Sequence, residues 1–232
     1  MAESAHSTAT LRLAMGDLRI AHPITVPNAA VPAAEIVPAL QGLVNAVVEA
    51  AETGKAISCR KGCGACCRQL VPVSRTEGER LLQVVDAMPT GRREALKARF
   101  AAAEAAIEAA GLKERQGRSD RELSTAYFAM GVPCPFLEDE SCSIHPERPL
   151  VCREYLVTSP AALCAGSKQE GVTPVAVPKV SMAARGLQED GDDWFPLAML
   201  MAWGRTRPRK AAKRTGPEWV QRFLKRLSSA SR

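Results

Sequence analysis

The chain has 232 residues, of which 46% are hydrophobic and 24% are charged, with a formal net charge of +6. This composition is typical of a soluble globular protein, and no apolar run is expected to reach the roughly 20 residues of a membrane-spanning helix. Aromatic residues make up only 4% of the chain and do not interleave with basic residues. A base-stacking surface for single-stranded nucleic acid is therefore not expected.

The N-terminal part of the chain is expected to form β structure followed by a helix. Two short alternating apolar runs flank a Gly-Asp turn, which predicts a small β-hairpin over residues 11–20. Residues 21–33 contain three prolines, so we expect an extended connection there. Apolar residues at i, i+3 and i+4 spacing between Ile36 and Val48 then predict a helix that stops at Gly54.

Three further helices are predicted between residues 74 and 130. Ser74 and Glu77 have the spacing of a capping box, which predicts the start of the first helix. Thr90 is expected to cap the second helix, which is rich in alanine and polar on one side. A second capping box at residues 119–122 predicts the third. The chain between the two groups of cysteines is therefore expected to be a helical insertion.

The chain changes character after residue 164. Residues 172–178 are expected to be irregular because two prolines interrupt them. The apolar segment from Trp194 to Trp203 follows an acidic run at 189–193 and predicts a buried helix, which we interpret as core and not as a binding groove. A capping signal at residues 215–218 opens a final helix with one apolar side and one basic side.

The positive charge of the chain resides at its C-terminal end. Residues 205–232 contain ten basic residues and one acidic residue, a net charge of +9, which leaves −3 on the first 204 residues. Nucleic acid, an acidic protein partner or anionic lipid could bind this end of the chain. We favour the simpler interpretation, a docked helix whose basic face is solvated.

Eight cysteines form one ordered cluster, and the rest of the chain has none. Thiolates bind soft or borderline metals such as zinc and iron, and a structural site needs about four of them from two or more segments. The cluster therefore predicts a metal centre. Its candidate ligands are Cys59, Cys63, Cys66, Cys67, Cys134, Cys142, Cys152 and Cys164.

The spacing of the first four cysteines is compatible with two local structures. On a helix they would project from one face, whereas Gly62 and Gly64 favour a tight irregular fold; either brings the thiols together. Adjacent Cys66 and Cys67 fit poorly as two ligands of one tetrahedral zinc, which favours two metals or a multinuclear cluster. Eight thiols suffice for two four-cysteine centres, or for one cluster with four cysteines left over.

A disulfide framework is the main alternative, because the number of cysteines is even. The N-terminus has no basic segment followed by an apolar one, so secretion is not expected and a cytoplasmic location is favoured. In a reducing compartment, clustered cysteines more often bind metal or take part in catalysis. A chain of this length can also bury a core without disulfides.

Several basic residues lie next to the cysteines in the sequence. Cations there would lower thiol pKa values and offset the charge of a thiolate-bound metal. Arg153 is the strongest candidate because it follows a cysteine directly, and Arg148 is another. His145 is a candidate ligand, but a hydrogen-bonding role in the turn before the next proline is favoured. The remaining candidate cations are Arg60, Lys61 and Arg68.

Two runs of residues resemble a known family. The segment from Cys59 to Cys67, together with the pieces Cys-Pro-Phe-Leu, Cys-Ser-Ile and Arg-Pro-Leu-Val-Cys-Arg-Glu-Tyr between residues 134 and 155, is similar to the YkgJ-type cysteine-cluster family, the zinc- or iron-chelating CxxCxxCC domain. The resemblance extends from about Cys59 to Cys164. The chain departs from the family pattern in the three residues that separate its first two cysteines, and in His145, where a tyrosine is common.

The resemblance implies a metal-chelating domain with eight cysteines, whose members are often described as iron–sulfur proteins and which includes the flagellin lysine N-methylases. An iron–sulfur cofactor is therefore expected, with zinc as the alternative. The first functional expectation is a metal-binding or electron-carrying module that assists a protein partner or partner enzyme. The others are a zinc-binding structural module, an enzyme that modifies protein side chains, and a zinc-stabilised nucleic-acid adaptor.

Together these features predict a mainly α-helical, irregular single domain that is organised by metal and carries a small N-terminal β-hairpin. Residues 1–32 would form the hairpin and extended connection. Residues 33–204 would form the metal-binding domain, with the helical insertion at 74–130, and residues 205–232 a basic C-terminal helix.

Overall fold

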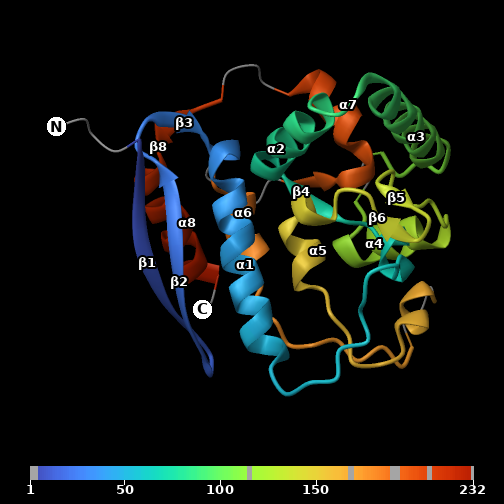
Figure 1. Ribbon diagram of the computed structural model, residues 1–232. Helices are drawn as coiled ribbons and strands as arrows, with labels where there is room; N and C mark the ends of the chain where they lie inside the picture. Colours follow the sequence, from blue (N-terminus) through green and yellow to red (C-terminus); the bar gives the residue numbers. More distant parts are fainter. Residues whose placement is uncertain (1–4, 114–116, 167–169, 189–193, 208–210, 231–232) are drawn as a thin grey trace.

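The computed structural model describes residues 5–113, 117–166, 170–188, 194–207 and 211–230. Within these residues the chain forms eight α-helices and four two-stranded antiparallel sheets. The N-terminal hairpin and the C-terminal helix lie on one side of α1, and most of the other helices lie on the opposite side (Figure 1). The predicted fold class, mainly α and irregular with an N-terminal hairpin, is confirmed.

The hairpin is longer than the sequence predicted. Strands β1 (His6–Met15) and β2 (Leu18–Pro27) pair along their full length, so residues 21–27 of the expected connection at 21–33 are strand. Pro23 lies within β2 opposite Thr10. Both strands of a two-stranded sheet are edge strands, and alternate N–H groups of an edge strand point away from the partner strand. A proline is tolerated at such a position because no hydrogen bond of the sheet is lost.

Helix α1 (Val37–Glu52) follows the 3-10 turn η1 (Ala33–Ile36) and forms the centre of the molecule. Its apolar stripe is fully buried, as the periodicity predicted, and Gly54 follows its end with a positive φ of 74°. The segment from Ala33 to Glu52 is long and apolar enough to cross a membrane by length and composition, which was not expected from the sequence. Half of that segment is buried in the molecule, and the core helix of a soluble protein passes the same test.

The insertion folds into three helices, as predicted. These are α2 (Arg75–Asp86), α3 (Thr90–Ala109) and α4 (Asp120–Ala129). Both predicted capping boxes are present, at Ser74 before α2 and at Ser119 before α4. The prediction for Thr90 is wrong, because Pro89 occupies the cap position and Thr90 is already helical.

The apolar segment from Trp194 to Trp203 is not one helix. It begins as strand β7 (Trp194–Pro196), antiparallel to β4 (Pro72–Ser74), and continues through η5 (Leu197–Met199) into α7 (Leu200–Thr206). Proline disfavours helix in the residue before it, so the helix begins only after Pro196. The segment is core as expected, and the rings of Phe195 and Trp203 stack with centroids 4.5 Å apart. The acidic run at 189–193 lies outside the described residues.

The C-terminal helix α8 (Gly216–Ala230) docks through its apolar side, as predicted. Trp219 and Phe223 are fully buried, and the Trp219 Nε1–H donates to the Val31 carbonyl oxygen at 2.9 Å. Val31 belongs to β3 (Ala30–Pro32), which pairs with β8 (Lys213–Thr215) just before α8. The two ends of the chain are therefore joined in one core. The basic residues Arg209, Lys210 and Arg232 lie outside the described residues.

The buried side chains of the described residues form two large cores and a third, smaller one, and cysteines pack at the edges of the two large ones. The first core joins β2, α1, α8 and α6 (Val180–Arg185), and Cys59 packs at its edge. The second joins α2, α3, β7 and α7, and Cys134 and Cys142 pack at its edge. The two groups of cysteines therefore pack against different cores.

Candidate metal centre

Four parts of the chain bring the eight cysteines together. The first four cysteines lie in the loop after α1 and in the 3-10 turn η2 (Ala65–Arg68). The hairpin of β5 (Leu137–Glu138) and β6 (Ser141–Cys142) follows Cys134 and ends with Cys142. The short helix α5 (Leu150–Glu154) carries Cys152, and the 3-10 helix η4 (Ala161–Ala165) carries Cys164. All eight are free thiols in this structure.

The first four cysteines are not on a regular α-helix. Gly62 has a φ of +85°, in the left-handed region that favours glycine, and the chain turns there. At Gly64 a Cβ atom would lie 2.7 Å from both the Leu137 Cδ1 and the Glu140 Oε2 atoms, so a side chain would push the loop away from the hairpin. Of the two local structures predicted, the tight irregular fold is present.

Four thiols lie close enough to influence one another in every pairwise combination. Burial, together with the neighbouring thiols of Cys142 and Cys66, raises the pKa of Cys134 to about 12. Burial also raises the pKa of Cys142 and of Cys152, with added contributions from neighbouring thiols. We call this group the first thiol set: Cys66, Cys134, Cys142 and Cys152.

Other thiols also interact with that of Cys66. Burial raises the pKa values of Cys59 and Cys164, and each of these thiols also interacts with those of Cys63 and Cys66. The Tyr155 hydroxyl points to the Cys164 Sγ atom at 4.0 Å. Cys67 shares a hydrogen bond with Cys66 that raises the Cys66 pKa. We call the four cysteines that remain outside the first set the second thiol set: Cys59, Cys63, Cys67 and Cys164.

The thiols are neighbours but do not form a closed chelate. Among the described residues, no three His, Cys, Asp or Glu side chains meet at the spacing of a metal-ligand set. Clustered thiols with raised pKa values stay protonated until a cation offsets the charge of the thiolates. Soft sulfur donors suit zinc and iron, so the chemistry of this donor set fits the predicted metals. The individual ligand assignments remain predictions.

The β5–β6 hairpin holds the first cysteine loop in place. Asp139 and Glu140 form its two-residue turn and both have positive φ, 48° and 56°, as a type I′ turn requires. Glu140 accepts hydrogen bonds from both terminal nitrogens of Arg68, at 3.1 and 2.6 Å. The Cys134 N–H also donates to the Cys67 carbonyl oxygen at 2.7 Å. The two cysteine segments are thus joined by backbone and by side chains.

The buried carboxylate of Glu77 positions helix α5. The sequence predicted for this residue only a role in the capping box at Ser74. Glu77 closes the capping box at Ser74, and its other oxygen accepts a hydrogen bond from the Leu150 N–H at 2.7 Å. Burial raises the pKa of Glu77. At the other end of α5, Glu154 accepts hydrogen bonds from the backbone and hydroxyl of Ser181, at 2.6 and 2.7 Å. These contacts fix the helix that carries Cys152.

The two leading candidate cations have different surroundings. Arg153 is buried, and it donates to the Arg148 and Pro146 carbonyl oxygens and to the Asn45 Oδ1 atom. Its donors therefore tie α5 to α1. The Arg148 side chain lies near cysteines of both thiol sets. Its positive charge partly offsets the rise in pKa of four thiols: Cys59, Cys66, Cys142 and Cys152.

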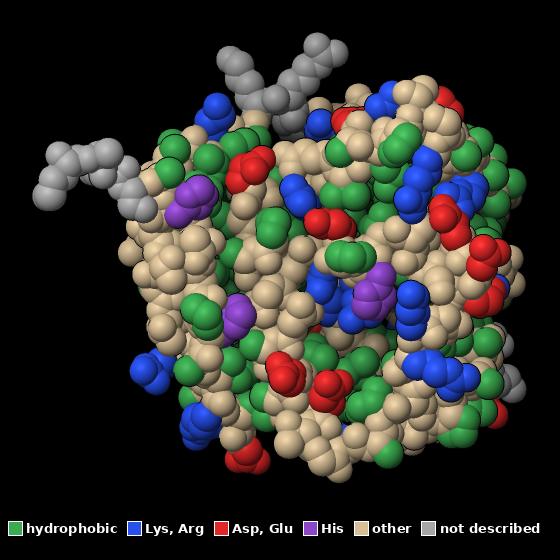
Figure 2. All heavy atoms as spheres, in the orientation of Figure 1, with side chains coloured by type: hydrophobic (Ala, Val, Ile, Leu, Met, Phe, Trp, Pro, Cys, Tyr) green, Lys and Arg blue, Asp and Glu red, His purple; other side chains and the backbone are tan. Residues whose placement is uncertain are grey.

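The other candidates lie at the surface. Arg60 and Lys61 are exposed, and Arg68 is paired with Glu140. His145 is also exposed. Partial desolvation of its ring and the nearby cations Arg148, Arg153 and Lys61 lower its pKa. Its neighbourhood is therefore cationic, and its role as a ligand or as a hydrogen-bonding group in the turn stays a prediction. Basic side chains gather over the middle of this face, above the position of α5 (Figure 2).

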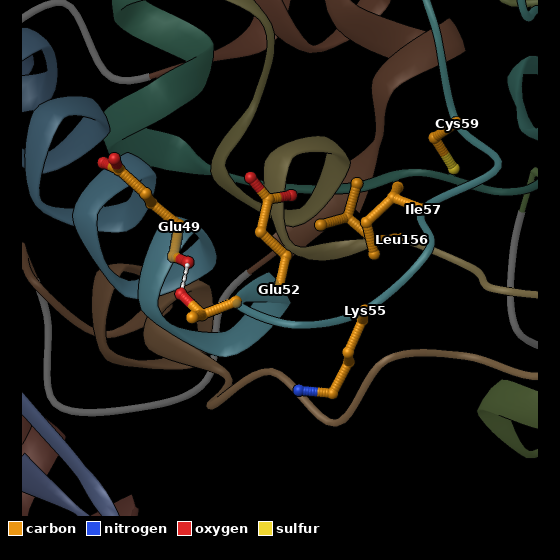
Figure 3. Close-up of a pocket in the computed structure, with 7 residues that line it drawn as sticks. Glu49, Glu52, Lys55, Ile57, Cys59 and Leu156 are labelled. Carbon is orange, nitrogen blue, oxygen red and sulfur yellow. Dashed lines mark hydrogen bonds between the residues drawn. The ribbon is translucent and has the colours of Figure 1, made fainter.

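A surface hollow adjoins the second thiol set. It has a volume of about 530 Å³ and is lined by residues from the end of α1, by the loop that follows and by Leu156. Ile57 and Leu156 lie side by side between the Cys59 thiol and the Glu52 carboxylate (Figure 3). The second thiol set is therefore accessible from solvent on the side of Cys59.

One comparison with known proteins finds a match. The model of the CxxCxxCC family, described as "Putative zinc- or iron-chelating domain", matches residues 58–173, which is half of the chain and contains all eight cysteines. No curated protein and no solved structure matches. The resemblance stated from the sequence is confirmed, and metal chelation is the function that the match supports.

Proposed function

Since the chain belongs to the CxxCxxCC family of zinc- or iron-chelating domains, we propose that its eight cysteines hold iron in two adjacent iron–sulfur centres, which exchange electrons with a protein partner. Each thiol set would supply the four thiolates of one centre. Adjacent Cys66 and Cys67 then serve different centres, which resolves the difficulty of placing both on one metal.

The observation that carries this proposal is the mutual proximity of the first thiol set. Every pair among its members interacts, although they come from η2, the β5–β6 hairpin and α5. Four like-charged thiolates this close repel one another, and a bound cation removes that repulsion. When iron is bound it supplies one-electron redox chemistry, and the protein residues hold the thiolates and limit access of water.

Access to the surface supports electron exchange as the role. Cys59 lines an open hollow, so one member of the second thiol set lies within reach of a docked partner. A zinc-binding structural module is the second candidate, because a set of four thiols also matches the four-cysteine sites that bind structural zinc. Its centres would have no redox activity.

Metal and sulfide analysis of anaerobically purified protein decides between the two. We expect a coloured protein that contains iron and acid-labile sulfide in equal amounts, and whose visible absorption bleaches on reduction and returns on oxidation. Colourless protein with stoichiometric zinc and no sulfide would establish the zinc module. Anaerobic handling is essential, because a solvent-accessible cluster can be lost in air.

A further inference from the structure

The backbone of Arg148 is held firmly between η3 (His145–Glu147) and α5. Its carbonyl oxygen accepts hydrogen bonds from the Arg153 Nε atom at 3.0 Å and from the Gln41 Nε2 atom at 3.4 Å. Both donor side chains are buried. These hydrogen bonds from α1 and α5 therefore fix the backbone of Arg148, from which its side chain extends.

The Nε–H of Arg148 has no acceptor in the protein. The nitrogen is shut off from solvent and makes no hydrogen bond. Leaving a buried donor unpaired costs roughly 1–3 kcal/mol, and more when the group is charged, so such groups normally have a partner. A buried guanidinium nitrogen without a partner points to an anionic acceptor that completes the site.

The surroundings of Arg148 identify the chemistry of that acceptor. Its charge acts on four cysteine thiols, two of them in α5 and the β5–β6 hairpin and two in the loop that contains η2. Two other arginines near the cysteines have acceptors already: Arg68 is paired with Glu140, and Arg153 donates to Asn45 and to backbone carbonyls. Arg99 also has a buried Nε atom without a partner, but its charge acts on Cys134, in the first thiol set. Arg148 thus combines proximity to both thiol sets with an unused donor.

We propose that Arg148 is a positioning residue of the metal centre, whose buried Nε–H donates to a cysteine thiolate in the loaded protein and whose charge offsets that of both thiol sets. This inference rests on the proposed function, since it requires that the cysteines bind metal. It differs from the sequence-based expectation, which ranked Arg153 first. Groups that bond to metal ligands in this way typically change metal affinity by about 10- to 100-fold when they are replaced.

The test uses Zn²⁺ alone as the probe, because thiolates bind zinc whichever metal is resident. Affinity is measured on the full chain by competition with a chromogenic chelator, for wild type, Arg148→Met, Arg148→Lys and the control Arg60→Met. Arg60 adjoins Cys59 in sequence but is exposed. We expect Arg148→Met to bind Zn²⁺ about 10-fold or more weakly and Arg148→Lys to fall between, with Arg60→Met unchanged.

A thermal melt of the metal-free variants separates positioning from a structural role. Metal-free Arg148→Met should unfold at the wild-type temperature or above it, because the substitution removes an unpaired buried donor. If the protein holds iron, its reduction potential should fall in Arg148→Met, since a positive charge beside the thiolates is lost.

Three outcomes overturn the inference. Arg148→Met that binds Zn²⁺ as tightly as wild type shows that the side chain does not act on the thiolates. Metal-free Arg148→Met that melts well below wild type, with Arg148→Lys binding normally, shows a structural residue. A wild-type chain that takes up neither zinc nor iron overturns the proposed function and this inference together, whereas the first two outcomes leave the proposed function intact.

Discussion

At the scale of single residues, the hydrogen-bond partners of a charged side chain could not be predicted from its position in the sequence. Arg153 follows Cys152 directly, and its side chain ties α5 to α1 through Asn45 while its charge also lowers the pKa of Cys142. Arg148 is four residues before Cys152 and faces the thiols. The cysteines could be named from the sequence, whereas the direction of the charged side chains depends on how α5 packs.

Glu77 shows a second limit at this scale. The spacing of Ser74 and Glu77 predicted a capping box, which the structure contains. The same carboxylate also accepts the Leu150 N–H, 73 residues away, and no local pattern contains that information. One buried side chain therefore links the start of α2 to the helix that carries Cys152.

Single cysteine substitutions test whether the two thiol sets are separate centres. Cys152→Ser removes a member of the first set and Cys164→Ser a member of the second, so each should lower the metal content of anaerobically purified protein by about half. The double variant should bind almost none. Complete loss from either single variant contradicts the partition and indicates one multinuclear cluster. Full metal content in both would show that neither cysteine is a ligand.

At the scale of elements, local signals predicted the helices well and the short strands poorly. Capping boxes and apolar periodicity are contained within about a dozen residues, and they located α1, α2, α4 and α8. Strands β3 and β4 each have three residues, and their partners β8 and β7 lie more than a hundred residues away. A strand that short is specified by its partner, so the sequence of the segment alone does not reveal it.

The packing of α2 against α7 yields a prediction in which two effects oppose each other. Alanine at Gly78 would favour the helix by about 1 kcal/mol. Its Cβ atom, however, would lie 2.7 Å from the Phe195 ring and 2.8 Å from the Trp203 ring, and these stacked rings cannot both move. We expect overpacking to win, so Gly78→Ala should lower the free energy of unfolding by about 1–3 kcal/mol in chemical denaturation.

Gly91 provides the matched control for that variant. It lies in the first turn of α3, and a Cβ atom there would have no neighbour within 4 Å. Gly91→Ala should therefore leave stability unchanged or raise it by up to about 1 kcal/mol. If both variants are stabilised to the same extent, the close packing of α2 on the aromatic pair is not present in solution.

At the scale of the whole molecule, the two cores have different relationships to the cysteines. The first contains the hairpin, α1, α6 and α8 together with Leu150 and Leu156 from the segment around Cys152, and Cys59 packs at its edge. The segments that carry the other cysteines have short helices, two-residue strands and turns. The sequence predicted a single domain organised by metal and long enough to bury a core, and the extent of buried apolar surface around α1 indicates that this part of the domain has such a core.

Hydrogen exchange with and without metal tests this division. Removing the metal with a chelator should lower protection most in residues 58–67 and 134–166, because the free energy of metal binding is folding free energy for the segments that carry the ligands. The amides of β1–β2, α1 and α8 should retain most of their protection, since 22 buried side chains form their core. An equal loss of protection in the cysteine segments and in β1–β2, α1 and α8 would contradict this division of the fold. It would show that the metal organises the entire chain.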